Sequence, residues 1–351
     1  APFKNIHLVC SENSPHFDEL KEVFSSASIT TSSIAYDPFN KLIEIPKSPK
    51  ERYKIMTSEM PKGGKLSLDM MYKTAGIQIN YDYISEEDFE KKFKIGNYLA
   101  PLTIALFANS PFNENKLSGF LSYRGKVWQE TNRGGIMPIT FENINFEKYI
   151  DHAINYPILF LKKNGKYYSP NGQTFRDFLN GNLSFLKGEK PTLEDFENHL
   201  GTIFTEIRLK QVIEFRSLDT CNFGCICNGP SFFTGLIYGS LDETYEIIKN
   251  WKKEEVMEAY LNAPKQGLNT ELRNKKLIDW AKIFLDLSKK GLDKRNELNK
   301  SGKNETIYLK HLEEIIKNKK TRAEMLIEQY NKTKKLDFLT NHDENFSYSG
   351  F

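Results

Sequence analysis

Two stretches of sequence decide the fold: AGIQINYDY at residues 75–83 and QVIEFRS at residues 211–217. In the first stretch apolar and polar side chains alternate, so Ile77, Ile79 and Tyr81 point to one side of an extended chain. This alternation predicts a strand with one buried and one polar face, and the second stretch predicts another strand of the same kind.

The polar faces of these two strands carry the side chains that are able to do chemistry. Gln78, Asn80 and Asp82 lie on the first, and Glu214 and Arg216 share one face of the second. Amide and charged groups of this kind bind phosphate or cations. They also form ordinary hydrogen bonds and ion pairs on a solvated sheet, so from the residues alone both interpretations stay open.

The remaining pattern is helical at the start and at the end of the chain. Residues 11–26 predict a helix with Leu20, Val23 and Phe24 on one face. Further predicted elements are helices at 51–59 and 86–109, a hairpin at 157–169 with Asn164-Gly165 at its turn, and helices at 230–249, 252–262, 273–290, 305–317 and 321–332.

Strands and helices are therefore mixed in the first two thirds of the sequence, and the last third is helical, which predicts an α+β fold. We expect an α+β catalytic region at residues 1–228, a helical region packed on it at 229–335 and a C-terminal tail at 336–351.

Composition excludes several classes of protein. The 351 residues include 49 basic and 46 acidic side chains, a net charge of +3, which gives no reason to expect a nucleic-acid surface. No apolar run has the length of a membrane helix, and no secretory signal is visible. We expect a cytoplasmic protein without nucleic-acid or membrane partners.

Four cysteines occur, at Cys10, Cys221, Cys225 and Cys227. They are too few for a disulfide scaffold, and their clustering favours reduced thiols in a cytosolic enzyme. The C-x3-C-x-C run could also bind a metal, but no fourth ligand is evident nearby. We therefore expect structural thiols and no long-range redox switch.

The common signatures of nucleotide-binding loops, dinucleotide-binding folds, zinc proteases and serine hydrolases are absent. Several longer motifs carry a resemblance instead. Residues 69–83, 105–128 (ALFANSPFNENKLSGFLSYRGKVW) and 198–219 (NHLGTIFTEIRLKQVIEFRSLD) resemble the plant and proteobacterial type of glutamate–cysteine ligase. The resemblance continues through residues 170–176 and 229–233 and covers nearly the whole chain.

The resemblance implies a curved, mainly antiparallel sheet of glutamine synthetase-like type whose polar face holds ATP and Mg²⁺. It also implies the substrates L-glutamate, L-cysteine and ATP. The glutamate γ-carboxylate would attack the γ-phosphate of ATP, and the cysteine amine would displace phosphate from the acyl phosphate, the first step of glutathione synthesis. Two anions meet in this reaction, at about 4 kcal/mol for each unit-charge pair ~4 Å apart in a dielectric of ~20. Metal ions and arginines have to offset that repulsion.

By the resemblance, Glu214 is a magnesium ligand, Arg216 and Gln78 are catalytic, and Asn80 and Arg216 contact the ATP phosphates. Arg124, in FLSYRGKVW, is expected to clamp a glutamate carboxylate with its planar fork. Trp128 is expected to form a pocket wall, and plain core packing is the alternative.

The segment that precedes the first strand resembles the part of the family that lines the glutamate pocket. It supplies Met71, Lys73 and Thr74, with Lys73 where many relatives carry arginine. Arg133 follows in a glycine-rich loop and is expected to make a second anion contact.

Two strands that bear metal-binding glutamates in the family have no counterpart in residues 1–70. We expect an N-terminal segment or a partner chain to complete the sheet. Two alternatives remain: a γ-glutamyl ligase that uses another amine, and a non-catalytic binding homologue that has lost its metal site.

Overall fold

The computed structural model describes residues 2–340, so the last part of the predicted tail, 341–351, lies outside the described residues. At its centre is an antiparallel sheet with the order β1-β7-β6. β1 comprises Gly76–Tyr81, β7 Ile213–Asp219 and β6 Ile207–Leu209. Both predicted strands are therefore confirmed, and they are hydrogen-bonded neighbours.

The register of the sheet determines which polar side chains meet. Glu214 lies opposite Asn80 on one side and opposite Arg208 on the other. Directly opposed residues of an antiparallel pair project to the same face. The register of β1 and β7 shifts between Ile77 and Ile79, where the pairing is irregular.

The buried side of β1 is the predicted one: Ile77, Ile79 and Tyr81 are buried, while Gln78 and Asn80 are exposed. These apolar side chains join one large cluster with residues of β6, β7 and the helices. Burial of such side chains contributes about 1.5–3 kcal/mol each, which fixes the face that β1 turns to the core.

The predicted helix at 86–109 is two helices, α4 (Glu86–Tyr98) and α5 (Ala100–Leu106). Pro101 explains the break, because it stands in the first turn of α5 and cannot donate a backbone hydrogen bond to α4. Both helices pack against β7.

The first helix begins earlier than predicted. α1 comprises Ile6–Ser26, and Asn5 caps it by accepting a hydrogen bond from the amide of Leu8. The buried residues of α1 are Ile6, His7 and Cys10, whereas Val23 is 57% exposed. The predicted apolar face is only partly covered, because Leu20 and Phe24 are half-buried and α1 packs on the rest of the protein through its first turns and through Phe17, whose ring lies 4.9 Å from that of Phe223.

The predicted helix at 230–249 is also interrupted. It consists of α11 (Asn228–Thr234), the π-helix η4 (Gly235–Gly239) and α12 (Leu241–Ile248). At Gly235 an added Cβ would lie 2.2 Å from the carbonyl oxygen of Ser288 in α14. The close approach of the two backbones requires glycine there.

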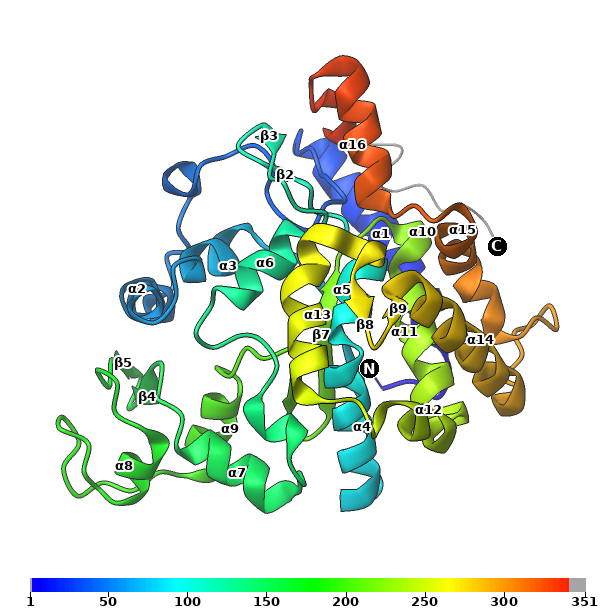
Figure 1. The fold of residues 1–351 in the computed structure, drawn as a ribbon. Coiled ribbons are helices and arrows are strands. Elements are labelled where there is room, and N and C mark those ends of the chain that lie inside the picture. The colour runs from blue at the N-terminus through cyan, green and yellow to red at the C-terminus, as the bar shows by residue number, and fades with distance from the viewer. Residues whose placement is uncertain (1, 341–351) are drawn as a thin grey trace.

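The remaining elements follow the chain in order, and Figure 1 shows the orange and red helices near the C-terminus on the side of the molecule opposite the green β4–β5 hairpin. They are α2 (Glu51–Glu59), α3 (Ser67–Lys73), β2 (Phe112–Asn113), β3 (Lys116–Leu117), α6 (Tyr123–Gln129), α7 (Phe146–Ile154), β4 (Leu161–Lys163), β5 (Lys166–Tyr168), α8 (Phe175–Leu179), α9 (Leu193–Leu200), α10 (Phe223–Ile226), α13 (Lys253–Gln266), β8 (Glu271–Leu272), β9 (Lys275–Lys276), α14 (Leu277–Arg295), the 3-10 helix η6 (Glu305–Leu309), α15 (Lys310–Asn318) and α16 (Arg322–Thr333).

The mixture of helices with small antiparallel sheets confirms the α+β class. The main apolar cluster contains residues from both predicted regions, among them Ile79, Phe215 and Phe284. The division at residue 228 stays a prediction. Within residues 2–340, helices that combine enough length and hydrophobicity to traverse a bilayer are not found.

The expectation of reduced thiols was wrong, because all four cysteines form disulfides in the structure. Cys10 of α1 forms a disulfide with Cys227, 217 residues along the chain, and Cys221 forms one with Cys225. Clustering in sequence concealed the first pair, because Cys10 is brought to Cys227 only when α1 packs beside α10 and α11. The Cα atoms of this pair are 6.3 Å apart, an ordinary distance for a disulfide.

The two disulfides should contribute unequally to stability. Loop-closure entropy predicts about 5 kcal/mol for a bond that spans 217 residues and about 2 kcal/mol for one that spans 4. We expect the double replacement Cys10→Ser with Cys227→Ser to lower the free energy of unfolding more than Cys221→Ser with Cys225→Ser. Urea denaturation of the oxidised proteins measures the difference, and an equal loss in both would contradict it.

Candidate functional site

The polar face of the sheet is organised around Glu214. Its Oε2 atom accepts hydrogen bonds from Nε of Arg208, at 2.6 Å, and from Nη1 of Arg216, at 3.5 Å. Nη2 of Arg208 also lies 2.5 Å from the same oxygen, and Lys210 is 4.0 Å from Oε1 at the rim. Glu214 is therefore a buried carboxylate held mainly by one arginine fork.

Arg216 joins this pair to β1. Its Nη1 donates to Oε1 of Gln78 at 2.9 Å, and Asn80 is exposed on the same strand. Burial lowers the pKa of Arg216 to about 10, and the neighbouring guanidinium of Arg208 acts in the same direction. The structure thus brings together Gln78, Asn80, Glu214 and Arg216, as the sequence predicted.

Arg124, in the first turn of α6, contacts the same strand. Ser122 caps α6 and donates through its hydroxyl to Asp219, at the end of β7. Arg124 donates to the carbonyl oxygen of Arg216 at 2.7 Å and lies 3.6 Å from Asp219. A Cβ at Gly76 would lie 2.5 Å from Nη2 of Arg124, so a larger residue there would displace this guanidinium group.

Trp128, one turn later in α6, contacts both arginines. The guanidinium carbons of Arg124 and Arg216 are 5.3 Å and 5.4 Å from its ring. Such contacts are favourable, by about 0.5–2 kcal/mol each. Trp128 also packs in an apolar cluster with Met70 and Leu159, which is the core packing that the sequence left open as the alternative, and its role as a pocket wall stays a prediction.

Arg124, Trp128 and Arg216 form what we term the guanidinium cluster, and it has unused donors. The three side chains are only 3%, 5% and 5% exposed. Within residues 2–340, Nε of Arg124, Nε of Arg216 and Nε1 of Trp128 have no hydrogen-bond acceptor. Buried donors are normally paired, so their presence in one cluster indicates a site for an anionic ligand.

Three residues of the site were missed from the sequence: Arg208, Asp219 and Glu206. Arg208 stands one strand away from Glu214, and the alternation of TEIRLK could have indicated it. Asp219 accepts from the amide of Asn109 and from two serine hydroxyls, and burial raises its pKa. Glu206 directly precedes β6 and is buried.

The other predicted pocket residues are engaged elsewhere. Lys73 donates to the carbonyl oxygen of Asn40 at 2.6 Å and to Oδ1 of Asn113 at 3.0 Å, and burial lowers its pKa. Thr74 donates to the carbonyl oxygen of Met70, within its own helix turn, and Met71 is half-buried in α3.

Arg133 is also turned away from the guanidinium cluster. Its Nε donates to the carbonyl oxygen of Thr202 at 2.8 Å, and Nη2 donates to that of Pro157 at 3.0 Å. Its guanidinium lies 4.9 Å from the ring of Tyr156, and burial lowers its pKa to about 10. In this arrangement it joins loops instead of facing a ligand.

The residues present do not form a magnesium site by themselves. Within residues 2–340 there is no group of three or more histidine, cysteine or carboxylate side chains placed to hold a metal. Glu214 is already paired with Arg208, and its other charged neighbours, Lys210 and Arg216, are also cations. Such a face favours an anion, whereas Mg²⁺ requires several oxygen ligands.

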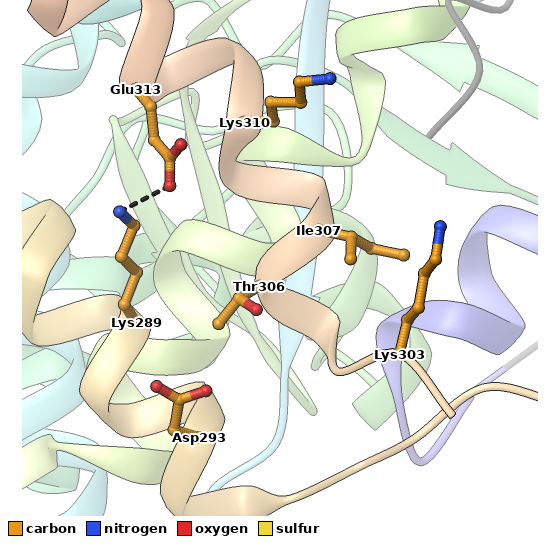
Figure 2. Close-up of a pocket in the computed structure, with 7 residues that line it drawn as sticks. All are labelled: Lys289, Asp293, Lys303, Thr306, Ile307, Lys310 and Glu313. Atoms are coloured by element: carbon orange, nitrogen blue, oxygen red, sulfur yellow. Dashed lines mark ion pairs between the residues drawn. The ribbon is translucent and has the colours of Figure 1, made fainter. Parts of the chain in front are cut away.

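A surface pocket of about 480 Å³ lies between α14 and η6–α15 and is lined by Lys289, Asp293, Lys303, Thr306, Ile307, Lys310 and Glu313 (Figure 2). None of these residues belongs to the sheet. Lys289 is paired with Glu313 at 2.5 Å, and the lysines alternate with acidic residues. Among the described residues that line this pocket, none has a buried unpaired donor of the kind found in the guanidinium cluster.

Comparison with known proteins identifies the class. The model of glutamate–cysteine ligase family 2 matches residues 1–342, and the chain belongs to this family. It is 40% identical to the chloroplastic glutamate–cysteine ligase of Solanum lycopersicum over 335 residues, which covers 94% of this chain and 63% of that protein.

Two further relatives are similar. The chain is 39% identical to the chloroplastic glutamate–cysteine ligase B of Oryza sativa subsp. japonica, covering 94% of this chain and 66% of that protein. It is also 39% identical to the chloroplastic enzyme of Arabidopsis thaliana, covering 94% and 63%. The chain thus spans 63% to 66% of the length of these relatives.

The names of the relatives overturn one prediction. All three are called chloroplastic, so the expectation of a cytoplasmic protein was wrong. That expectation rested on reduced thiols and on the lack of a visible signal, and the structure contains disulfides instead.

The pairing of Glu214 with Arg208 gives a stability prediction. Arg208→Met leaves a buried carboxylate without its nearest cation, and we expect a loss of about 3–5 kcal/mol in the free energy of unfolding. A second change, Glu214→Gln, should restore part of that loss. Urea denaturation measures both, with Lys210→Met at the exposed rim as the control, expected within about 0.5 kcal/mol of the unmodified protein. A loss from Lys210→Met as large as that from Arg208→Met would contradict the pairing.

Proposed function

We propose that this protein is an ATP-dependent ligase that joins the γ-carboxylate of glutamate to the amine of cysteine. The observation that carries the proposal is the guanidinium cluster with its buried, unpaired N–H groups, in a chain of the glutamate–cysteine ligase family. Planar N–H donors of this kind are suited to a carboxylate or a phosphate.

The two arginines suggest a division of labour. Arg124 is the more enclosed and is fixed by Asp219 and by the backbone of β7, which suits a group that binds a glutamate carboxylate. Arg216 reaches the polar face beside Gln78 and Asn80, where the phosphates of ATP would lie. Trp128, in contact with both, would hold the two guanidinium groups at a constant separation.

This arrangement addresses the main barrier of the reaction. A carboxylate and a polyphosphate repel one another, by about 4 kcal/mol per unit-charge pair at ~4 Å in a dielectric of ~20. Two guanidinium groups already in place lower this cost without reorganisation during the reaction. Arg216 and Gln78 are the residues that we propose to act on the transferred phosphate.

Mg²⁺ stays a prediction, with Glu214 as its proposed ligand. We propose that additional carboxylates reach this face from a further segment or from a partner chain, as part of a glutamine synthetase-like sheet. We likewise propose that residues 1–228 form the catalytic region, with the helices of 229–335 packed on it.

Two rival functions remain open. A γ-glutamyl ligase for another amine would use the same guanidinium cluster and differ only in where the amine binds. A non-catalytic homologue would bind glutamate without turning over ATP.

The reaction itself tests the proposal. We expect ATP consumption only when glutamate is present, and formation of γ-glutamylcysteine in preference to other γ-glutamyl amides. Coupled phosphate release and mass spectrometry of the products measure the two quantities. Turnover of ATP without glutamate, or no preference among amines, would count against a glutamate–cysteine ligase.

A matched pair of substitutions tests the carboxylate clamp. Arg124→Lys keeps a positive charge near Asp219 but loses the fork, so we expect the KM for glutamate to rise about tenfold or more with a smaller change in kcat. Arg133→Lys makes the same change at another buried arginine above an aromatic ring. Urea denaturation should show a lower stability for Arg133→Lys, and steady-state kinetics should show that its KM for glutamate is similar to that of the unmodified protein. An unchanged KM in Arg124→Lys would remove the clamp from the proposal.

A further inference from the structure

Glu206 is an acidic residue that the proposed function does not use. It lies directly before β6 and is 2% exposed. Its backbone is fixed on both sides, because its amide donates to the carbonyl oxygen of Gly135 and its carbonyl oxygen accepts from the amide of Arg216. The backbone of Glu206 is therefore held beside Arg216, and the charges of Arg124 and Arg216 act on its carboxyl group.

The immediate partner of this carboxyl group is a buried phenol. Tyr260 of α13 donates its hydroxyl hydrogen to Oε1 of Glu206 at 2.6 Å. The charged groups that act on Glu206 are Arg124 of α6 and Arg216 and Asp219 of β7. Within the described part of the chain Glu206 makes no ion pair, so its cationic neighbours act on it at longer range.

The charges of the site do not balance without Glu206. Asp219 holds Arg124, while Glu214 is shared between Arg208 and Arg216. Three guanidinium groups are thus matched by two carboxylates. If Glu206 is ionised, the buried charges cancel, and if it carries a proton, one positive charge remains.

Two states of Glu206 are therefore available, each with a physical reason. An isolated positive charge is costly to bury, which favours an ionised Glu206 while the site is empty. Burial favours the protonated form, and it raises the pKa of Glu206. An anion placed on the arginines would supply the missing negative charge and repel a carboxylate beside it.

We propose that Glu206 is the proton-linked counter-charge of this site: it is ionised while the site is empty and takes up one proton when an anionic substrate lies on Arg124 and Arg216. The inference rests on the proposed function, with glutamate as the anion. The proton comes from the solvent, and the protonated carboxyl group stays hydrogen-bonded to Tyr260.

The affinity for glutamate should therefore depend on pH. The bound anion raises the pKa of Glu206 above its value in the empty site, so binding takes up protons between these two pKa values. Across that range the affinity for glutamate should fall as the pH rises, with a limiting slope of about tenfold per pH unit. Below the lower pKa and above the higher pKa the affinity should be constant.

Isothermal titration of L-glutamate into the full chain tests this, at several pH values from about 5 to 8, where raised carboxyl pKa values lie. At each pH two buffers of different ionisation enthalpy are used, so that the number of protons taken up is measured directly. The variants are Glu206→Gln, which cannot ionise, and Tyr260→Phe, which keeps Glu206 but removes its donor. Glu258→Gln makes the same chemical change on the exposed side of α13 and is the control.

We expect net proton uptake in the unmodified protein and in Glu258→Gln, and none in Glu206→Gln. At the alkaline end Glu206→Gln should bind glutamate about tenfold more tightly than the unmodified protein, because its site keeps the extra positive charge. Tyr260→Phe should move the range of proton uptake to higher pH, because the phenol stabilises the ionised carboxylate.

The outcomes distinguish a failure of the proposed function from a failure of the role proposed for Glu206. If the unmodified protein binds no glutamate, the proposed function fails and this inference fails with it. If it binds glutamate without proton uptake, or if Glu206→Gln takes up as many protons, the proposed function stands and the role of Glu206 is refuted. A purely structural role for Glu206 would lower the stability of Glu206→Gln but would leave the slope of affinity against pH unchanged.

Discussion

The contact between Asp219 and Arg124 is the constraint on which the rest of the site depends. Asp219 is the last residue of β7, and its carboxylate accepts hydrogen bonds from the hydroxyls of Ser110 and Ser122 and from the backbone amide of Asn109. These hydrogen bonds fix the carboxylate independently of Arg124. It thereby joins the end of the sheet to the start of α6. The position of α6 in turn brings Trp128 into contact with Arg216 of β7.

Burial makes this arrangement both costly and specific. A guanidinium group taken from water loses several kcal/mol of solvation, and only well-placed partners offset that loss. The protein supplies those partners unevenly. Arg208 is almost fully hydrogen-bonded, whereas Nε of Arg124 and Nε of Arg216 have no acceptor among residues 2–340. The unevenness distinguishes an arginine that supports the fold from those able to receive a ligand.

Local patterns in the sequence were sufficient for some of this and not for the rest. Alternation along β1 correctly separated Ile79 from Asn80, because the period of a strand is a property of the strand alone. The partners Arg208 and Asp219 depend on register and on the packing of α6, which join distant parts of the chain. For the same reason the motif around Lys73 indicated a pocket, while the side chain itself turns to Asn113.

The bond between Cys10 and Cys227 has a mechanical consequence. It closes the chain into a covalent ring that contains the whole central sheet, the first helices and the guanidinium cluster. Tension applied to the chain on either side of this ring would pass through the sulfur atoms and bypass everything inside the ring. The helices from α11 onwards would extend under load, while the strands that carry Gln78, Glu214 and Arg216 would remain unloaded.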